Sequence, residues 1–406
     1  MAKYEEANLM HKKMMAVSQR LAEFEKSGTG HKKKLNIARD RLYAGQCNCP
    51  YWHGVFGGLY LPHIRQAIYA NLVEAESILI ELSGQKENQI HISDFDADGH
   101  DEIRVSSPDL TAVFKPSRGG TLVELSINKL AFSITDTLTR RKEGYHLKLD
   151  EAVAPGESAK TSSIHDLVLA KEKGLKELLI EDWYLKRCFI DHFFNGQVDF
   201  EAFRSGEFRE DGDFVLEAYQ YTLDEQSGDL ILSRDGHLWK PDGLIELRLL
   251  KRFGFDAGSG RVRVTYEISS PKGEPVEVVF GIENNFNLQA GHAPDRYVLI
   301  DHERPGDSYL DTSAVHTDVR SFAVADEARN IGLAFESDRP AEIWQLPIFT
   351  VSLSEGGFEK VYQGTTFVNC YRLKLSEEPT ELSLALLTGS LSDVRQAMRS
   401  ISTVSR

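Results

Sequence analysis

Cysteine is scarce in this sequence of 406 residues. The four cysteines, Cys47, Cys49, Cys188 and Cys370, are too few and too scattered for the disulfide framework of an extracellular protein. We therefore expect reduced thiols and a cytoplasmic location. Cys47 and Cys49 form a C-x-C pair, but a metal site with four protein ligands needs a second close pair, which the sequence lacks.

Long apolar runs and an excess of positive charge are also missing. No run approaches the ~20 apolar residues that a membrane-spanning helix needs, and residues 1–19 do not have the pattern of a signal peptide. The 62 acidic residues outnumber the 47 basic ones, which gives a formal charge of -15 that repels phosphate backbones and anionic lipids. We therefore expect neither nucleic acid nor a membrane as a partner.

The composition that remains is that of a globular protein, with 41% hydrophobic and 27% charged residues. In residues 1–86, apolar side chains recur every three or four positions over Tyr4–Ser27, Leu35–Leu42 and Pro62–Gly84. Pro62 suits the first turn of a helix, where a backbone N–H has no partner. This periodicity predicts a three-helix bundle as the first domain.

Residues 87–406 have a different pattern, with short runs of period two separated by turn residues, which predicts a second domain that is a large antiparallel β-sandwich. The fold class is therefore α+β. A helix-containing insertion is expected near residues 162–194, and a mobile loop over Asp150–Ser163. The expected strands are Glu102–Val105, Leu110–Phe114, Thr121–Ile127, Phe214–Tyr221, Ile245–Arg252, Arg261–Ile268, Val276–Glu283, Asn330–Phe335 and Thr366–Leu375.

The loop between the second and third predicted helices is the first candidate binding site. Tyr51 and Trp52 are suited to stack on the apolar face of a sugar ring, while Gln46, Asn48 and His53 offer hydrogen bonds to hydroxyl groups. Glycines in the same loop allow the backbone to approach a ligand closely. The alternative is a packed loop whose aromatic rings fill a core.

An acidic segment is the second candidate site. Asp94, Asp96, Asp98, His100 and Glu102 lie in a stretch that fits D-x-D-x-D-G-x-x-E, with His100 contributing its backbone carbonyl. Calcium prefers six to eight such oxygen ligands. The alternative is an acidic β-turn, but neighbouring aspartates repel one another without a cation. The sequence therefore favours calcium as a structural ion.

Groups for acid–base chemistry are harder to find. Asp182, Asp191 and Glu283 lie among apolar or aromatic neighbours, and each also fits the description of a hydrogen-bonded structural residue. The sequence has no G-x-S-x-G elbow, phosphate-binding loop or H-E-x-x-H motif.

The segment Gln46–His63 resembles the last signature segment of family 57 glycoside hydrolases, most closely that of α-amylases and 4-α-glucanotransferases. Glu6–Met14 resembles the start of their middle helical domain. Phe114–Gly120 is similar to part of their C-terminal sandwich, which is galactose-mutarotase-like. The resemblance implies a role in the chemistry of α-1,4-glucans with retention of configuration.

The same resemblance implies that catalysis needs a barrel that this sequence does not contain. In the family, a barrel before this region carries a glutamate nucleophile and an aspartate acid, and a retaining mechanism needs two carboxyl groups about 5–5.5 Å apart. We therefore expect no catalytic residue in this chain, and whether it is itself an enzyme is left open. We expect the chain to be the C-terminal portion of such an enzyme, either a truncated product or one half of a split enzyme whose barrel is a separate chain. In both cases it would shape subsites for an α-1,4-glucan or maltooligosaccharide and act as a scaffold for the barrel. Apolar surface around Val55, Phe56, Leu59 and Tyr60 should then be exposed.

Two alternative functions stay open. A free-standing carbohydrate-binding module would bind glucan through Trp239, Trp344 or residues near Glu283. A sugar epimerase would combine a glutamate with histidines such as His192, His237 or His292, as implied by the mutarotase-like class.

Overall fold

Three helices form the first layer of the fold. The computed structural model describes residues 3–402 apart from 29, 55–56, 152–169, 195, 197, 242, 257, 273–274 and 355. The helices are α1 (Glu5–Ser27), α2 (Lys32–Ala44) and α3 (Pro62–Leu82). The predicted helices are confirmed, because their periodic apolar residues meet in one core that includes Met10, Val17, Leu21, Leu42 and Leu72.

A small antiparallel sheet follows the helices, with its strands in chain order. Its strands are β1 (Gln89–Ser93), β2 (Glu102–Ser106), β3 (Leu110–Lys115), β4 (Thr121–Ile127) and β5 (Phe132–Ser133). The prediction of strands at residues 102–127 is confirmed. The change from helix to strand falls between Leu82 and Gln89, where the boundary of the two domains is expected.

The second sheet has eleven strands, in the order β6-β11-β15-β14-β16-β10-β9-β8-β7, with β13 paired to β14 and β12 paired to β13. Its strands are β6 (Ile190–Phe194), β7 (Gln220–Leu223), β8 (Leu230–Lys240), β9 (Gly243–Phe255), β10 (Arg261–Ser269), β11 (Val276–Phe286), β12 (Arg296–Ile300), β13 (Ala314–Asp326), β14 (Ile331–Ser354), β15 (Gly357–Leu375) and β16 (Thr380–Ser390). A short helix, α4 (Phe200–Ser205), follows β6, and α5 (Leu391–Ser402) follows β16.

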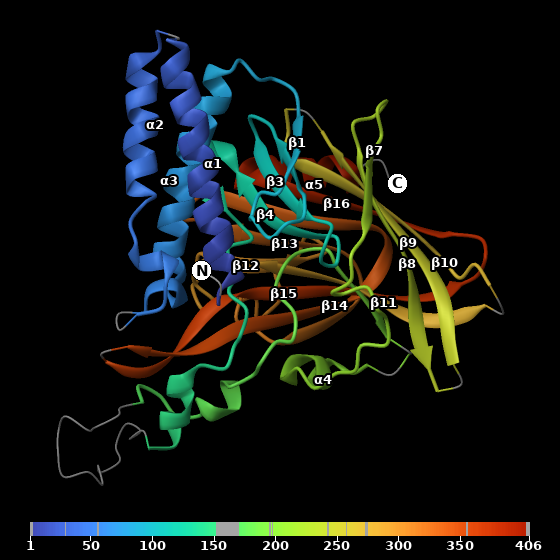
Figure 1. Ribbon diagram of the computed structural model, residues 1–406. Coiled ribbons are helices and arrows are strands. Elements are labelled where there is room, and N and C mark those ends of the chain that lie inside the picture. Colours follow the sequence, from blue (N-terminus) through green and yellow to red (C-terminus); the bar gives the residue numbers. More distant parts are fainter. Residues whose placement is uncertain are drawn as a thin grey trace.

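The two sheets share one hydrophobic core, which confirms the predicted large antiparallel sandwich. Val105 and Leu125 of the small sheet belong to the same buried cluster as Phe253 and Leu386 of the large sheet. The helices lie beside the small sheet (Figure 1), and α3 contacts β5. The fold therefore has three layers: the helices, then the small sheet, then the large sheet.

A buried lysine ties the helices to the small sheet. Nζ of Lys13 in α1 lies 2.7 Å from the carboxylate of Glu76 in α3 and 2.6 Å from that of Glu124 in β4. All three side chains are buried. Although burial opposes ionisation, Lys13 and Arg104 lower the pKa of Glu76 to about 2. The helical layer is thus anchored to the sandwich by charge as well as by apolar packing.

Two sequence predictions need correction. The described part of the expected insertion, residues 170–194, contains a 3₁₀ turn, η6 (Lys176–Leu178), and strand β6, with no α-helix in that part. Residues 162–169 of that insertion, and most of the loop expected at Asp150–Ser163, lie outside the described residues. The strand predicted at Phe214–Tyr221 begins only at Gln220, because Phe214 fills the sandwich core from an irregular segment.

The helices in the described part of the chain lack the combination of length and apolar character that crossing a membrane requires.

Candidate functional site: an aromatic loop and its supports

The candidate binding loop joins α2 to α3 and is folded back on itself. It contains two 3₁₀ turns, η1 (Cys49–Tyr51) and η2 (Gly58–Tyr60). The carbonyl of Trp52 accepts a hydrogen bond from the backbone N–H of Leu59 at 2.9 Å. Gly58 has φ of +50°, and a Cβ atom there would lie 2.2 Å from the carbonyl oxygen of Trp52. Glycine is therefore required for this closure.

The five predicted binding residues do not share one environment. Trp52 is 55% exposed, Gln46 and Asn48 are exposed, and His53 is half-buried. Tyr51 instead packs in the helical core, where its hydroxyl donates a hydrogen bond to the carbonyl of Gly45 at 2.6 Å. We therefore leave Tyr51 out of the candidate surface, since its ring has the core-filling role that the sequence left open.

The expected exposure of apolar side chains in this loop is wrong for the two described residues. Leu59 and Tyr60 are buried at 0% and 1% exposure, in a cluster with Tyr4 and Leu138. Val55 and Phe56 lie outside the described residues. The loop therefore turns Leu59 and Tyr60 inward, and among its described aromatic residues it presents Trp52 to solvent.

An aromatic cluster holds His53 next to Trp52. The His53 ring lies 4.5 Å from that of Tyr60 and 5.2 Å from that of Tyr145, measured between centroids. Nδ1 of His53 is 3.1 Å from the carbonyl of Gly57, so this nitrogen carries a hydrogen and donates it. In the neutral ring, Nε2 then has a lone pair that can accept a hydrogen bond from a hydroxyl group.

Glu143 connects this cluster to the start of the chain. Its Oε1 accepts hydrogen bonds from the hydroxyls of Tyr60 at 2.8 Å and Tyr4 at 2.9 Å. Lys3 forms an ion pair with the other carboxylate oxygen. Although burial opposes ionisation, the hydrogen bonds from Lys3, Tyr60 and Tyr4 hold the pKa of Glu143 below its usual value. The ionised carboxylate therefore fixes the ring against which His53 packs.

Arg65 of α3 connects the same loop to the sandwich through hydrogen bonds. Its buried guanidinium donates to the carbonyl of Leu59 at 2.6 Å, to Oε1 of Gln363 at 2.9 Å and to Oδ1 of Asp136 at 2.8 Å. Gln363 in turn donates to the carbonyl of Tyr60 at 2.8 Å. Burial raises the pKa of Asp136 to about 6, against the opposing effect of Arg65. These contacts fix the backbone that follows Trp52 and His53.

The acidic segment has a lysine among its carboxylates. Nζ of Lys115, on β3, lies 2.6 Å from Asp98 and 2.8 Å from Glu102, and also pairs with Asp96. The Lys115 side chain is only 3% exposed. The ammonium group therefore supplies the positive charge that the sequence alone assigns to calcium.

The carboxylate oxygens of the acidic segment are largely used within the chain. Asp94 accepts from the backbone N–H groups of Asp98 and Gly99, Glu102 from those of Phe95 and Asp96, and Asp98 from that of His100. With Lys115, seven of the eight oxygens of the four acids accept a hydrogen bond, and only Oδ1 of Asp96 lacks a partner among the described residues. Asp94, Asp96 and Glu102 each offer an oxygen within 4.8 Å of the others. Calcium as the ion of this segment stays a prediction from the sequence.

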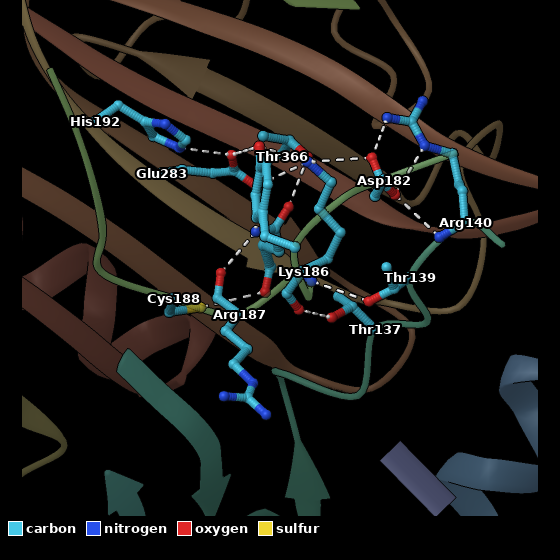
Figure 2. Close-up of polar contacts among 12 residues, drawn as sticks. Thr137, Thr139, Arg140, Asp182, Lys186, Arg187, Cys188, His192, Glu283 and Thr366 are labelled. Atoms are coloured by element: carbon cyan, nitrogen blue, oxygen red, sulfur yellow. Dashed lines mark hydrogen bonds and ion pairs between the residues drawn. The ribbon is translucent and has the colours of Figure 1, made fainter. Parts of the chain in front are cut away.

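Glu283 lies at the centre of a separate polar network in the large sheet. Figure 2 shows His192 and Lys186 directed at its carboxylate, at distances of 3.1 Å for both. The other ring nitrogen of His192 is 2.6 Å from Glu210. Although burial disfavours the charged ring, Glu210 and Glu283 raise the pKa of His192 to about 9. Glu283 and His192 are both candidates from the sequence, but they are 91 residues apart, so their contact could not be predicted from local pattern.

This network does not present a catalytic group to solvent. The side chains of Glu283 and His192 are fully buried, and Asp191 is equally buried against Lys251. Asp182 forms an ion pair with Arg140 at 2.6 Å (Figure 2). Each therefore has the structural role that the sequence left open. Because Glu283 and His192 are buried, these two residues do not support the epimerase alternative.

The comparisons with known proteins agree on one family. The family described as "Alpha-amylase/4-alpha-glucanotransferase, C-terminal" matches residues 94–384, and the corresponding middle domain matches residues 1–79. The chain belongs to the α-amylase/4-α-glucanotransferase family. The match to the middle domain coincides with the helical layer, and the match to the C-terminal domain coincides with the sandwich.

Relatives in this family match nearly all of the chain. α-Amylase 1 of Dictyoglomus thermophilum is 34% identical over 92% of this chain and 51% of its own length. A 4-α-glucanotransferase of Thermococcus kodakarensis is 32% identical over 90% of this chain and 48% of its own. The crystal structure of a 4-α-glucanotransferase from Thermococcus litoralis superimposes with a TM-score of 0.74 and 27% identity, over 95% of this chain and 50% of that chain. The chain thus spans about half the length of the relatives that it matches.

Proposed function

We propose that this chain is the C-terminal, substrate-shaping and scaffolding part of an enzyme that acts on α-1,4-glucans, with the catalytic carboxyl groups supplied by a barrel that lies outside this sequence. The observation that carries the proposal is the match to the middle and C-terminal domains of α-amylases and 4-α-glucanotransferases over nearly the whole chain. The assignment to family 57, which rests on the resemblance of the loop, belongs to this proposal. So does a cytoplasmic location, which the four free cysteines support.

Trp52 and His53 would form the part of the glucan-binding cleft that this chain contributes. An exposed indole face suits the apolar face of a glucose ring, and the Nε2 lone pair of His53 suits a sugar hydroxyl. Gln46 and Asn48 lie exposed on the same loop and add amide groups. Since the loop is clamped by Arg65 and Glu143, the indole and the imidazole are held in place before a substrate arrives.

A chimeric enzyme tests the proposal. This chain would replace the matching half of the Thermococcus litoralis 4-α-glucanotransferase, and disproportionation of maltotriose would be measured. We expect activity with the wild-type chain and a rise in KM of about tenfold for Trp52→Ala, as expected for the loss of one aromatic contact. Tyr43→Ala, an equally exposed aromatic on α2, is the matched control and should leave KM unchanged. A folded chimera without activity, or a Trp52→Ala variant with normal KM, would contradict the proposal.

A free-standing carbohydrate-binding module is the second candidate function, and one observation favours it. Trp239 is 42% exposed near the tip of the β8–β9 hairpin, directly across from Leu244, which is 59% exposed. The other residues considered for this function, Trp344 and Glu283, are buried. Calorimetric titration with maltoheptaose separates the two functions. Loss of binding with Trp239→Ala but not with Trp52→Ala would favour the module.

A further inference from the structure

A cavity of about 380 Å³ lies beside the candidate loop. Its walls come from the 3₁₀ helix η4 (Gly144–Glu151), from residues just after η6, and from β14 around Phe349 and Val351. Its size falls within the range of ligand-binding pockets, roughly 300–1,000 Å³. All of the lining residues belong to this chain.

The cavity is connected to His53 through two neighbouring side chains. The ring of Tyr145 lies 5.2 Å from that of His53 and 4.7 Å from that of His146. His146 lines the cavity, where its Nε2 donates a hydrogen bond to the carbonyl of Val351 at 2.8 Å, while its Nδ1 accepts one from the backbone N–H of Glu143. Tyr145 and His146 therefore lie between His53 and the cavity.

The charges around the cavity favour an uncharged ligand. Arg140 is held by Asp182 at 2.6 Å, and Arg141 by Glu6 at 2.7 Å. Among the described residues, two exposed charges without a recorded partner line the cavity, and they have opposite signs: Lys142 and Glu181. Such a set attracts neither anions nor cations strongly, but it offers both donors and acceptors to hydroxyl groups.

The apolar part of the lining suits a sugar ring. Leu147 is 74% exposed and Leu179 is 39% exposed at the cavity, and Phe349 of β14 forms part of the wall. Exposed leucines next to free polar groups match a ligand with one apolar and one hydroxylated side.

We propose that this cavity is a further glucan subsite, which binds glucosyl units of the same α-1,4-glucan chain that contacts Trp52. This inference rests on the proposed function for its substrate class. It adds a binding location next to the loop but outside it, and it requires that longer oligosaccharides gain affinity from Lys142 and Glu181.

Because the described lining residues all belong to this chain, the test can be made without a barrel partner. Hydrogen exchange measured by mass spectrometry, with and without maltoheptaose, should show protection at residues 140–148 and 176–183, and a β-linked glucan of equal length should give none. Calorimetry should show that Lys142→Ala/Glu181→Ala weakens maltoheptaose binding by about fivefold or more, as expected for the loss of two hydrogen bonds. The matched control is Lys34→Ala/Glu81→Ala, an exposed ion pair on the helices, which should bind as the wild type does.

Three outcomes would overturn the subsite: no protection at these residues, protection elsewhere only, or equal affinity in the cavity variant and the wild type. Protection that appears only with the unmatched half of the Thermococcus litoralis enzyme, and not with maltoheptaose, would identify a protein interface instead. None of these outcomes touches the effect of Trp52→Ala in the chimera, so a failed subsite and a failed proposed function can be told apart.

Discussion

Replacing Lys115 by methionine tests what neutralises the acidic segment. The substitution keeps most of the side chain's volume and removes the ammonium group that pairs with Asp96, Asp98 and Glu102. Breaking a buried ion pair by removing one partner costs roughly 3–5 kcal/mol. Lys115 is 3% and Glu102 1% exposed, but the Asp98 side chain is 39% exposed, so its share is screened by water.

We therefore expect Lys115→Met to lower the free energy of unfolding by about 3 kcal/mol, the lower end of that range. The Tm measured by scanning calorimetry should fall by roughly 5 °C or more. Lys272→Met is the matched control, because Lys272 and its partner Glu246 are exposed. Its Tm should stay that of the wild type.

Calcium adds a second readout to the same experiment. In the wild type, millimolar calcium or EDTA should leave Tm unchanged, since the ammonium already occupies the carboxylates. In Lys115→Met, the released oxygens of Asp96, Asp98 and Glu102 should bind calcium, and saturation to 100 times Kd would restore about 2.7 kcal/mol. A wild-type protein that loses stability in EDTA and regains it with calcium would refute this reasoning and support the calcium site that the sequence favours.

Two further predictions concern other buried charges. Arg65→Met should lower Tm by a similar amount, because it leaves Asp136 unpaired, and it should speed proteolysis of the loop near Trp52; unchanged Tm and proteolysis would contradict the clamp. The second concerns His192, whose pKa is about 9 in the fold against 6.5 for an ordinary histidine. Since the folded state holds this proton more tightly, the stabilisation is complete below about pH 6.5 and is lost as pH rises toward 9. Tm measured from pH 6 to 9.5 should therefore fall less steeply in His192→Gln than in the wild type, and equal slopes would count against a charged His192.

The helices could be predicted from sequence because their packing is local and periodic. Met10, Val17 and Leu21 recur at intervals of seven and four, which places them on one helix face, and all three are buried. A strand such as Thr121–Ile127 could be bounded because turn residues flank it on both sides. In both cases a few neighbouring residues determine the structure.

The long strand β14 shows where that reasoning stops. Only Asn330–Phe335 is predicted, whereas the strand continues to Ser354 through Pro340 and Pro347. Proline normally argues against a central strand, because it lacks the N–H that the ladder needs. Here Pro340 lies where β14 leaves its neighbour β16, and Pro347 lies beyond the last residue paired with β13. Both prolines thus occupy positions where one side of the strand has no partner, which only the sheet order reveals.

The candidate sites depend on contacts across the sequence even more strongly. A local motif marked the acidic segment, but its cation comes from Lys115, which lies next to Glu102 because Ile103 pairs with Phe114. The two strands predicted there, Glu102–Val105 and Leu110–Phe114, are adjacent in the sequence, so pairing them as a hairpin is the signal that could have pointed to Lys115. No residue in the aromatic loop predicts the role of Gln363, which is about 300 residues away and donates a hydrogen bond to the carbonyl of Tyr60. The composition of a loop can therefore name the residues that meet a ligand, whereas the residues that hold them in place come from distant parts of the chain.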